Sequence, residues 1–102
     1  MYSLIFYVPE THLEQVKEAV FAAGAGHLGN YDFVCWQVKG EGQFQPSLHA
    51  TPFIGEAGKL EELEEYRVEM MLLDDCREAV VSALKLSHPY EEVAYHLIAI
   101  EC

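Results

Sequence analysis

Six segments of the chain carry the hydrophobic periodicities of regular secondary structure, and their order constrains the fold more than any single motif. Strand-like runs occur at 2–8, 31–39, 66–73 and 92–100, rich in aromatic, β-branched or alternating apolar residues. Apolar residues at helical spacing predict one helix after the first strand and another after the third. The order strand–helix–strand–strand–helix–strand, with right-handed crossovers, predicts an α+β ferredoxin-like β-α-β-β-α-β sandwich, in which two helices cover one face of a four-stranded antiparallel sheet.

Local signals predict where the helices begin and end. Thr11 and Glu14 fit a capping box at the start of the first helix, and Asp75 and Glu78 form a similar pair before the second. The second helix is expected to end at about His88, because the proline that follows disfavours helical backbone there.

Three glycines in "GAGHLGNY" have the spacing G-x-G-x-x-G, which elsewhere cradles a dinucleotide pyrophosphate. That motif needs a strand before it and a helix after it, and here the order is reversed. We therefore interpret Gly24 as a helix C-cap, and the stretch as a tight helix-to-strand turn. Three glycines around His27 and Asn30 exceed the needs of a turn, which suggests close backbone approach by another segment or a ligand.

Composition limits the partners. The 102 residues suffice for one domain and one core, and 17 Asp and Glu against 6 Lys and Arg give a net charge of −11. Nucleic acid and anionic membranes are therefore poor partners. No run approaches the ~18 apolar residues of a membrane span, and the first residues lack the basic region of a secretory signal, so we expect a cytoplasmic protein. Cys35, Cys76 and Cys102 form neither a metal pair nor a disulfide framework, and we expect the first two to be reduced and near the core.

The sheet face without helices is expected to be apolar. Strand 2–8 is apolar at nearly every position, and strand 92–100 offers apolar residues to both faces. Such a patch usually marks an interface, so the sequence predicts a homo-oligomer that buries it. About 25 residues connect the second and third strands, a length typical of functional, oligomeric or mobile segments. Within them "EELEE" (61–65) is expected to be a solvated acidic face.

Four motifs resemble the middle domain of the YqfO family, the proteins related to the NGG-interacting factor that are sometimes labelled a GTP cyclohydrolase type. They are "GAGHLGNYDFVCW", "GEGQFQP", "ATPFIGEAGKLEELEEYRVE" and "HPYEEVAYHLIAIE", in order from about Gly24 to Glu101. The matching residues are Gly26, His27, Gly29, Asn30, Tyr31, Gly40, Gly42, Phe44, Pro46, Pro52, Gly55, His88, Pro89, Tyr90, Glu91 and Glu92.

The resemblance implies a fold and little chemistry. In longer family members this domain is inserted between two halves of a core that carries a two-metal site, and it is similar to CutA and PII proteins, which form trimers. A trimer is therefore the favoured oligomer. The metal ligands of that core have no counterparts in this chain, so neither its metal site nor a hydrolase activity carries over.

The stretch "HPYEE" (88–92) is the leading candidate for a ligand site. A turn there presents His88, Tyr90, Glu91 and Glu92 together at a helix end, and His is both a common metal ligand and a proton carrier near neutral pH. The structural alternative is that His88 caps the helix carbonyls, favoured by the helix dipole, and that the two glutamates are solvated.

A second candidate cluster lies at the end of the first helix. The two helices of this fold are expected to be parallel and to end on the same side of the molecule, which brings His27, Asn30 and Tyr31 near His88 and Glu91. The sequence then predicts a shared polar pocket for a small ligand or a divalent metal ion, with His27, His88 and Glu91 as candidate metal ligands. No catalytic residue is assigned.

Three functions remain open. The leading one is a non-catalytic oligomeric sensor or adaptor that binds a metal ion, a metabolite or a protein partner. The second is a metal-assisted enzyme that uses His88 with Glu91 or Glu92 as acid and base. The third is an assembly domain for a separately encoded metal-bearing core.

Overall fold

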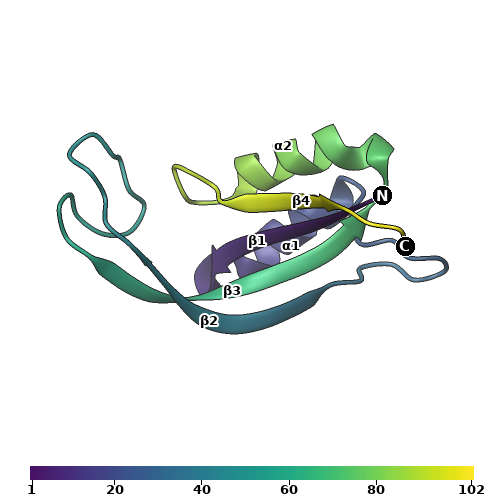
Figure 1. Ribbon diagram of the computed structural model, residues 1–102, viewed down its shortest axis with the longest axis horizontal. Coiled ribbons are helices and arrows are strands. Elements are labelled where there is room, and N and C mark those ends of the chain that lie inside the picture. Colours follow the sequence, from purple (N-terminus) through teal and green to yellow (C-terminus); the bar gives the residue numbers. More distant parts are fainter.

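Four strands and two helices follow one another in the expected order in the computed structural model, which describes all 102 residues (Figure 1). The elements are β1 (Tyr2–Pro9), α1 (Leu13–Ala22), β2 (Trp36–Phe44), β3 (Glu61–Leu72), α2 (Arg77–Ser87) and β4 (Tyr95–Ala99), with 3-10 turns η1 (Glu10–His12) and η2 (Asp74–Cys76) before the helices. All pairs are antiparallel in the order β2-β3-β1-β4, and both helices pack on one face. The α+β ferredoxin-like fold is confirmed. No helix is long and apolar enough to cross a membrane.

The core lies between the two helices and one face of β1 and β3. Alternate residues of these strands point toward the helices because successive side chains of a strand point to opposite faces. Each helix adds a stripe of residues spaced three or four apart. The fully buried side chains are Leu4, Phe6, Val8, Val68, Leu72, Val16, Val20, Val80 and Leu84. Cys35 and Cys76 are free thiols packed against this cluster, as expected.

Both predicted capping boxes are wrong. Thr11 lies inside η1, where its Oγ1 atom is 2.8 Å from His12 Nδ1, and the N-cap of α1 is His12 without a side-chain cap. α2 likewise follows a 3-10 turn, with no side-chain cap at Cys76. The 3-10 turns move each helix start past the expected cap residue. The predicted end of α2 is confirmed, since Ser87 is its last residue and His88 is extended.

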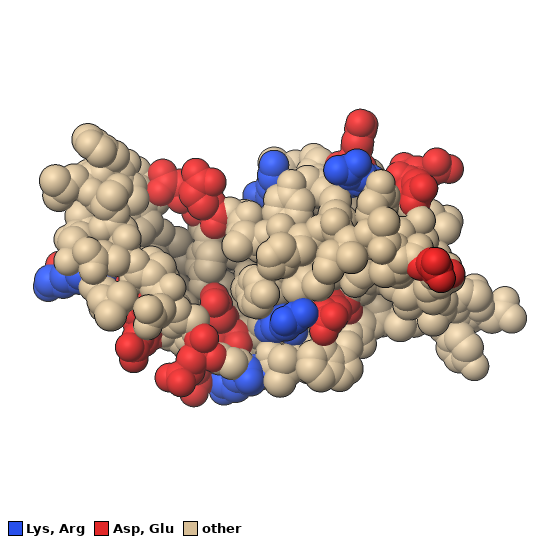
Figure 2. All heavy atoms as spheres, viewed as in Figure 1, with Lys and Arg blue, Asp and Glu red and all other residues tan.

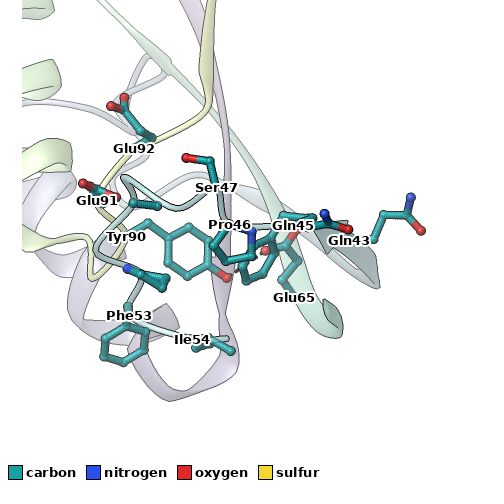
Figure 3. A pocket seen from close by; sticks show the side chains of 13 residues that line it. Gln43, Gln45, Pro46, Ser47, Phe53, Ile54, Glu65, Tyr90, Glu91 and Glu92 are labelled. Carbon is teal, nitrogen blue, oxygen red and sulfur yellow. Dashed lines mark hydrogen bonds between the residues drawn. The ribbon is translucent and has the colours of Figure 1, made fainter. Parts of the chain in front are cut away.

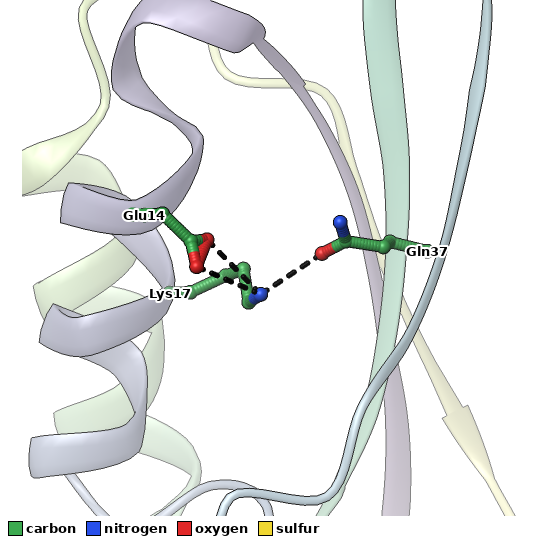
Figure 4. A network of polar contacts seen from close by, with 3 residues as sticks. All are labelled: Glu14, Lys17 and Gln37. Carbon is green, nitrogen blue, oxygen red and sulfur yellow. Dashed lines mark hydrogen bonds and ion pairs between the residues drawn. The ribbon is translucent and has the colours of Figure 1, made fainter.

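α1 is tied to the edge strand β2 through a lysine. Lys17 Nζ donates to Gln37 Oε1 at 2.9 Å and to Glu14 Oε2 at 3.1 Å (Figure 4). The Lys17 side chain is 14% exposed, so its charge is held in a largely covered position. The contact holds β2 close to the helical layer.

The strand expected at 31–39 is shifted toward the C-terminus. Leu28 and Tyr31 exchange two 3.0 Å backbone hydrogen bonds around a two-residue turn, and Phe33 has a positive φ of 57°. These contacts exclude residues 31–35 from the sheet, and β2 begins at Trp36. β3 begins at Glu61 instead of residue 66, so "EELEE" pairs with the second half of β2. Its Glu62 and Glu64 are solvent-exposed, while the alternate side chains are half-buried.

The glycine-rich stretch packs against the chain itself. Gly24 follows Ala23, the C-cap of α1, and has a positive φ of +120°, the position and backbone region at which glycine commonly ends a helix. Gly26 has a φ of +85°, donates its N–H to the Met71 carbonyl at 2.8 Å, and accepts from Val34 N–H at 2.8 Å. A Cβ at Gly26 would lie 2.6 Å from the Phe21 ring. The close approach expected here is made by neighbouring segments.

The two helices are antiparallel, which contradicts the expectation that they end on the same side. Because β1 and β3 run in opposite directions, the helices that follow them do too. The segment after α1 reaches Met71, which pairs with Ser3, whereas His88 after α2 reaches the Tyr7 carbonyl. Ser3 and Tyr7 are four residues apart, or roughly 13 Å along the strand. The helix ends therefore lie at opposite ends of the sheet.

The face of the sheet without helices is less apolar than expected. Ile5 at its centre is 6% exposed, and Trp36 and Ile98 are 58% and 50% exposed. Arg67 and Glu69 form an ion pair at 3.7 Å on the same face. Apolar surface is present there, but a charged pair divides it.

Beyond the Pro9–Glu65 pair, β2 and β3 continue without β1 as a two-stranded arm that ends at the Phe44–Glu61 pair. The arm elongates the molecule, whose extents are 47 × 24 × 23 Å. Figure 1 shows the loop at the tip of the arm turning back toward the connection between α2 and β4. The arm and this loop form the wall of the candidate site.

Candidate functional site

A pocket of about 460 Å³ lies where the loop between β2 and β3 meets the turn between α2 and β4. Figure 3 shows the Tyr90 ring beside Pro46, with Glu91 and Glu92 above them and Phe53 below. In Figure 2 the same end of the molecule is hollowed, and acidic side chains stand on both sides of the hollow. Three residues of the predicted "HPYEE" site, Tyr90, Glu91 and Glu92, therefore line a real cavity.

His88 lies behind the pocket wall and is a structural residue. Its side chain is 6% exposed, its Nε2 atom is 2.7 Å from the Tyr7 carbonyl, and its Nδ1 atom is 3.1 Å from Tyr90 N. A carbonyl accepts and a backbone N–H donates, so the neutral ring carries its proton on Nε2. Burial lowers the pKa of His88, against the raising effect of the hydrogen bond to Tyr7. The ring thus joins the end of α2 to β1 and holds the turn that carries Tyr90.

Tyr90 is fixed from two sides. Its ring packs on His88 with centroids 4.7 Å apart, and its hydroxyl donates to Glu65 Oε2 at 3.0 Å. Burial, followed by the nearby Glu65 charge, raises the pKa of the Tyr90 hydroxyl well above its ordinary value of 10.0. The phenol is therefore a neutral donor committed to Glu65.

The two glutamates of the turn differ in role. Glu91 Oε1 accepts a 2.9 Å hydrogen bond from the backbone N–H of Thr51, so it attaches the middle of the long loop to the turn. Glu92 is exposed on the pocket lining and makes no hydrogen bond or ion pair within the chain. Glu92 is the carboxylate available to a ligand.

The other predicted residues lie at the opposite end of the molecule. His27 Nδ1 is 2.6 Å from Asp32 Oδ1, both are exposed, and Asn30 and Tyr31 are in the hairpin beside them. The antiparallel helices separate this group from His88. No three His, Cys, Asp or Glu side chains in the chain converge as a metal site would require. Whether His27, Asn30 and Tyr31 bind a ligand stays a prediction.

Sequence reasoning missed part of the pocket wall. Phe44 and Glu65 come from the arm and Phe53 from the long loop, while Thr51 holds that loop to Glu91. The available signal was the length of that connection, which exceeds what a hairpin needs. It does not reveal which loop residues turn back toward residues 88–92.

Comparison with known proteins identifies relatives of greater length. No family model matches the chain. It is 46% identical to a GTP cyclohydrolase 1 type 2 homolog of Halalkalibacterium halodurans over 95% of the chain and 26% of that protein. A Bacillus cereus protein related to NIF3 superposes with a TM-score of 0.83 at 37% identity, over 99% of the chain and 26% of its own length. The CutA1 protein of Pyrococcus horikoshii, at 16% identity and a TM-score of 0.71, covers 100% of the chain and 85% of its own length, and shows likeness of fold. The chain therefore spans about a quarter of the relatives it matches in sequence.

Proposed function

We propose that the chain is a non-catalytic oligomeric binding module. As the sequence motifs predicted, it is similar over nearly its whole length to about a quarter of a GTP cyclohydrolase 1 type 2 homolog and of a protein related to NIF3. It binds a small molecule or a protein partner in the pocket under the long loop. The observation that carries the proposal is a formed cavity in which three polar lining residues, Glu65, Tyr90 and Glu91, are committed to hydrogen bonds that hold it together.

The commitments of the wall residues favour binding over catalysis. A general base must reach the proton it abstracts, and both nitrogens of His88 are engaged away from the pocket. Tyr90 and Glu65 satisfy one another, and Glu91 holds the loop. Glu92 makes no hydrogen bond within the chain, and its neighbour Glu91 is already bonded to the loop. The metal-assisted enzyme is the weaker alternative for these reasons.

Self-association is part of the proposal, with a trimer favoured. Trp36, Val38 and Ile98 are exposed on the face of the sheet without helices, and a second copy would remove them from water. Each buried large apolar side chain contributes about 1.5–3 kcal/mol. The charged Arg67–Glu69 pair on that face would help to fix how the copies align with one another.

A third proposed function is assembly beside a separately encoded metal-bearing core. The chain matches about a quarter of the length of its relatives. In that case the module contributes its pocket and its oligomeric contacts, and the core contributes any metal chemistry. A cytoplasmic location remains an expectation from the sequence.

Two measurements test the proposal. Light scattering should give a mass of three times the 11.6 kDa chain, and Trp36→Glu should reduce it to the monomer. A thermal-shift panel of metals, nucleotides, amines and sugars should contain a ligand that raises the unfolding midpoint by mass action without being turned over. A monomer with no response across the panel would refute the proposal, and turnover abolished by Glu92→Gln would favour the enzyme.

A further inference from the structure

We infer that the pocket under the long loop accepts a small organic cation, an amine or a quaternary ammonium group. This inference rests on the proposed binding function and specifies the ligand class. Three features support it: the pocket is lined by carboxylates, its walls are aromatic, and the carboxylates do not converge on one point.

The charge of the lining excludes anionic ligands. Glu65, Glu91 and Glu92 line the cavity, and no Lys, Arg or His does. His12 packs edge-to-face on the Phe53 ring, with centroids 5.3 Å apart, but is not part of the lining. A phosphate or carboxylate entering this pocket would meet like charges in a chain of net charge −11, whereas a cation would be attracted.

The walls offer aromatic surface to the same ligand. Phe44, Phe53 and Tyr90 line the pocket, and Phe53 is half-exposed toward solvent. Aromatic faces attract ammonium and guanidinium groups that lie within about 6 Å of the ring centroid. Because the Tyr90 hydroxyl is bonded to Glu65, that ring is held in place before any ligand arrives.

The arrangement of the carboxylates favours an extended cation over a metal ion. Divalent Ca²⁺ or Mg²⁺ needs several oxygens gathered around one point. Here Glu65 is bonded to Tyr90, Glu91 is bonded to Thr51, and no three acidic or metal-ligating side chains converge. Glu92 alone makes no hydrogen bond within the chain and can pair with an ammonium group. Glu65 and Glu91 add negative electrostatic potential across the cavity.

Calorimetric titration with 1,4-diaminobutane and with tetramethylammonium tests the inference at constant ionic strength. Inorganic phosphate, GTP and Mg²⁺ are the comparison ligands. We expect saturable binding of at least one amine and none of phosphate or GTP. Glu92→Gln should weaken amine binding by about five-fold, the effect expected for one partly screened charge pair.

Glu18→Gln is the matched control, because Glu18 is an exposed residue of α1 that makes no hydrogen bond or ion pair within the chain. It removes the same charge away from the pocket and should leave amine binding unchanged. Equal weakening in the two variants, or no amine binding at all, would overturn the inference. If GTP or Mg²⁺ binds instead, the binding module stands and the cation assignment fails. If nothing on the wider panel binds and the chain is monomeric, both fail.

Discussion

The backbone N–H of Thr51 and the carboxylate of Glu91 form a 2.9 Å hydrogen bond across 40 residues of sequence. It joins the middle of the longest connection in the chain to the turn after α2. Behind that turn His88 is bonded to β1, so a continuous series of contacts runs from the core to the loop. The pocket depends on these hydrogen bonds, and substitutions of His88 and Tyr90 should reveal what each one contributes to stability.

Replacing His88 with alanine should destabilise the fold. The change removes both ring hydrogen bonds and leaves the Tyr7 carbonyl and the Tyr90 N–H without their partners. We expect a loss of about 2 kcal/mol in the free energy of unfolding, measured by urea denaturation. His96→Ala on β4, an exposed position, should cost less than about 0.5 kcal/mol. Equal effects would mean that His88 does not connect the turn to β1.

The free energy of unfolding should also fall on mild acidification because of His88. Burial places the folded-state pKa of His88 below the 6.5 of an unfolded chain, so the unfolded state binds more protons between the two values. The stabilisation is therefore fully present above pH 6.5 and is lost as the pH falls from there through the folded-state pKa. The difference in unfolding free energy between wild type and His88→Gln, measured between about pH 5 and pH 8, should shrink toward the acid side. A difference that grows on acidification would contradict this assignment.

Tyr90→Phe should cost about 1 kcal/mol, because the substitution leaves Glu65 without its 3.0 Å donor and keeps the ring. The raised pKa can be measured directly with the same pair of proteins. Subtracting the ultraviolet titration of Tyr90→Phe from that of wild type isolates one phenol, whose midpoint should lie clearly above 10.0. A midpoint at or below that value would show that burial and Glu65 do not act on this hydroxyl.

Gly26→Ala should destabilise the chain more than Gly40→Ala. At Gly26 the φ of +85° disfavours any other residue, and the new methyl group would lie 2.6 Å from Phe21. We expect a loss of about 2 kcal/mol for Gly26→Ala and a change within about 0.5 kcal/mol for Gly40→Ala, where no atom lies within 4 Å. Thermal or chemical unfolding of the two variants makes the comparison, and similar stabilities would refute the close-packed turn.

The fold was predictable because its signals are local and periodic. The continuous apolar run of β1 and the helical stripes around Val16 and Val80 required no knowledge of the rest of the chain. The errors arise where a backbone turn or a distant segment overrides the periodic pattern. Residues 31–35 alternate as a strand does, but the Leu28–Tyr31 hairpin removes them from the sheet.

The candidate site was predictable only in part. The turn at residues 88–92 contains a proline and several polar residues, which marked it, and three of its side chains line the pocket. His27 was placed beside His88 because the helix directions were misjudged, although the antiparallel pairing of β1 and β3 fixes them. Phe53 and Thr51 could not be found, since their position depends on how the loop folds back.

The long loop and the turn at residues 88–92 are joined by the Thr51–Glu91 hydrogen bond, so they should behave as one site that is formed before a ligand binds. Hydrogen exchange of the Thr51 amide, resolved by NMR, measures this in wild type, Glu91→Ala and the control Glu18→Gln. We expect a protected Thr51 amide in wild type and in the control, and fast exchange confined to the loop in Glu91→Ala. A Thr51 amide that already exchanges in wild type at the rate of an unstructured peptide would contradict it.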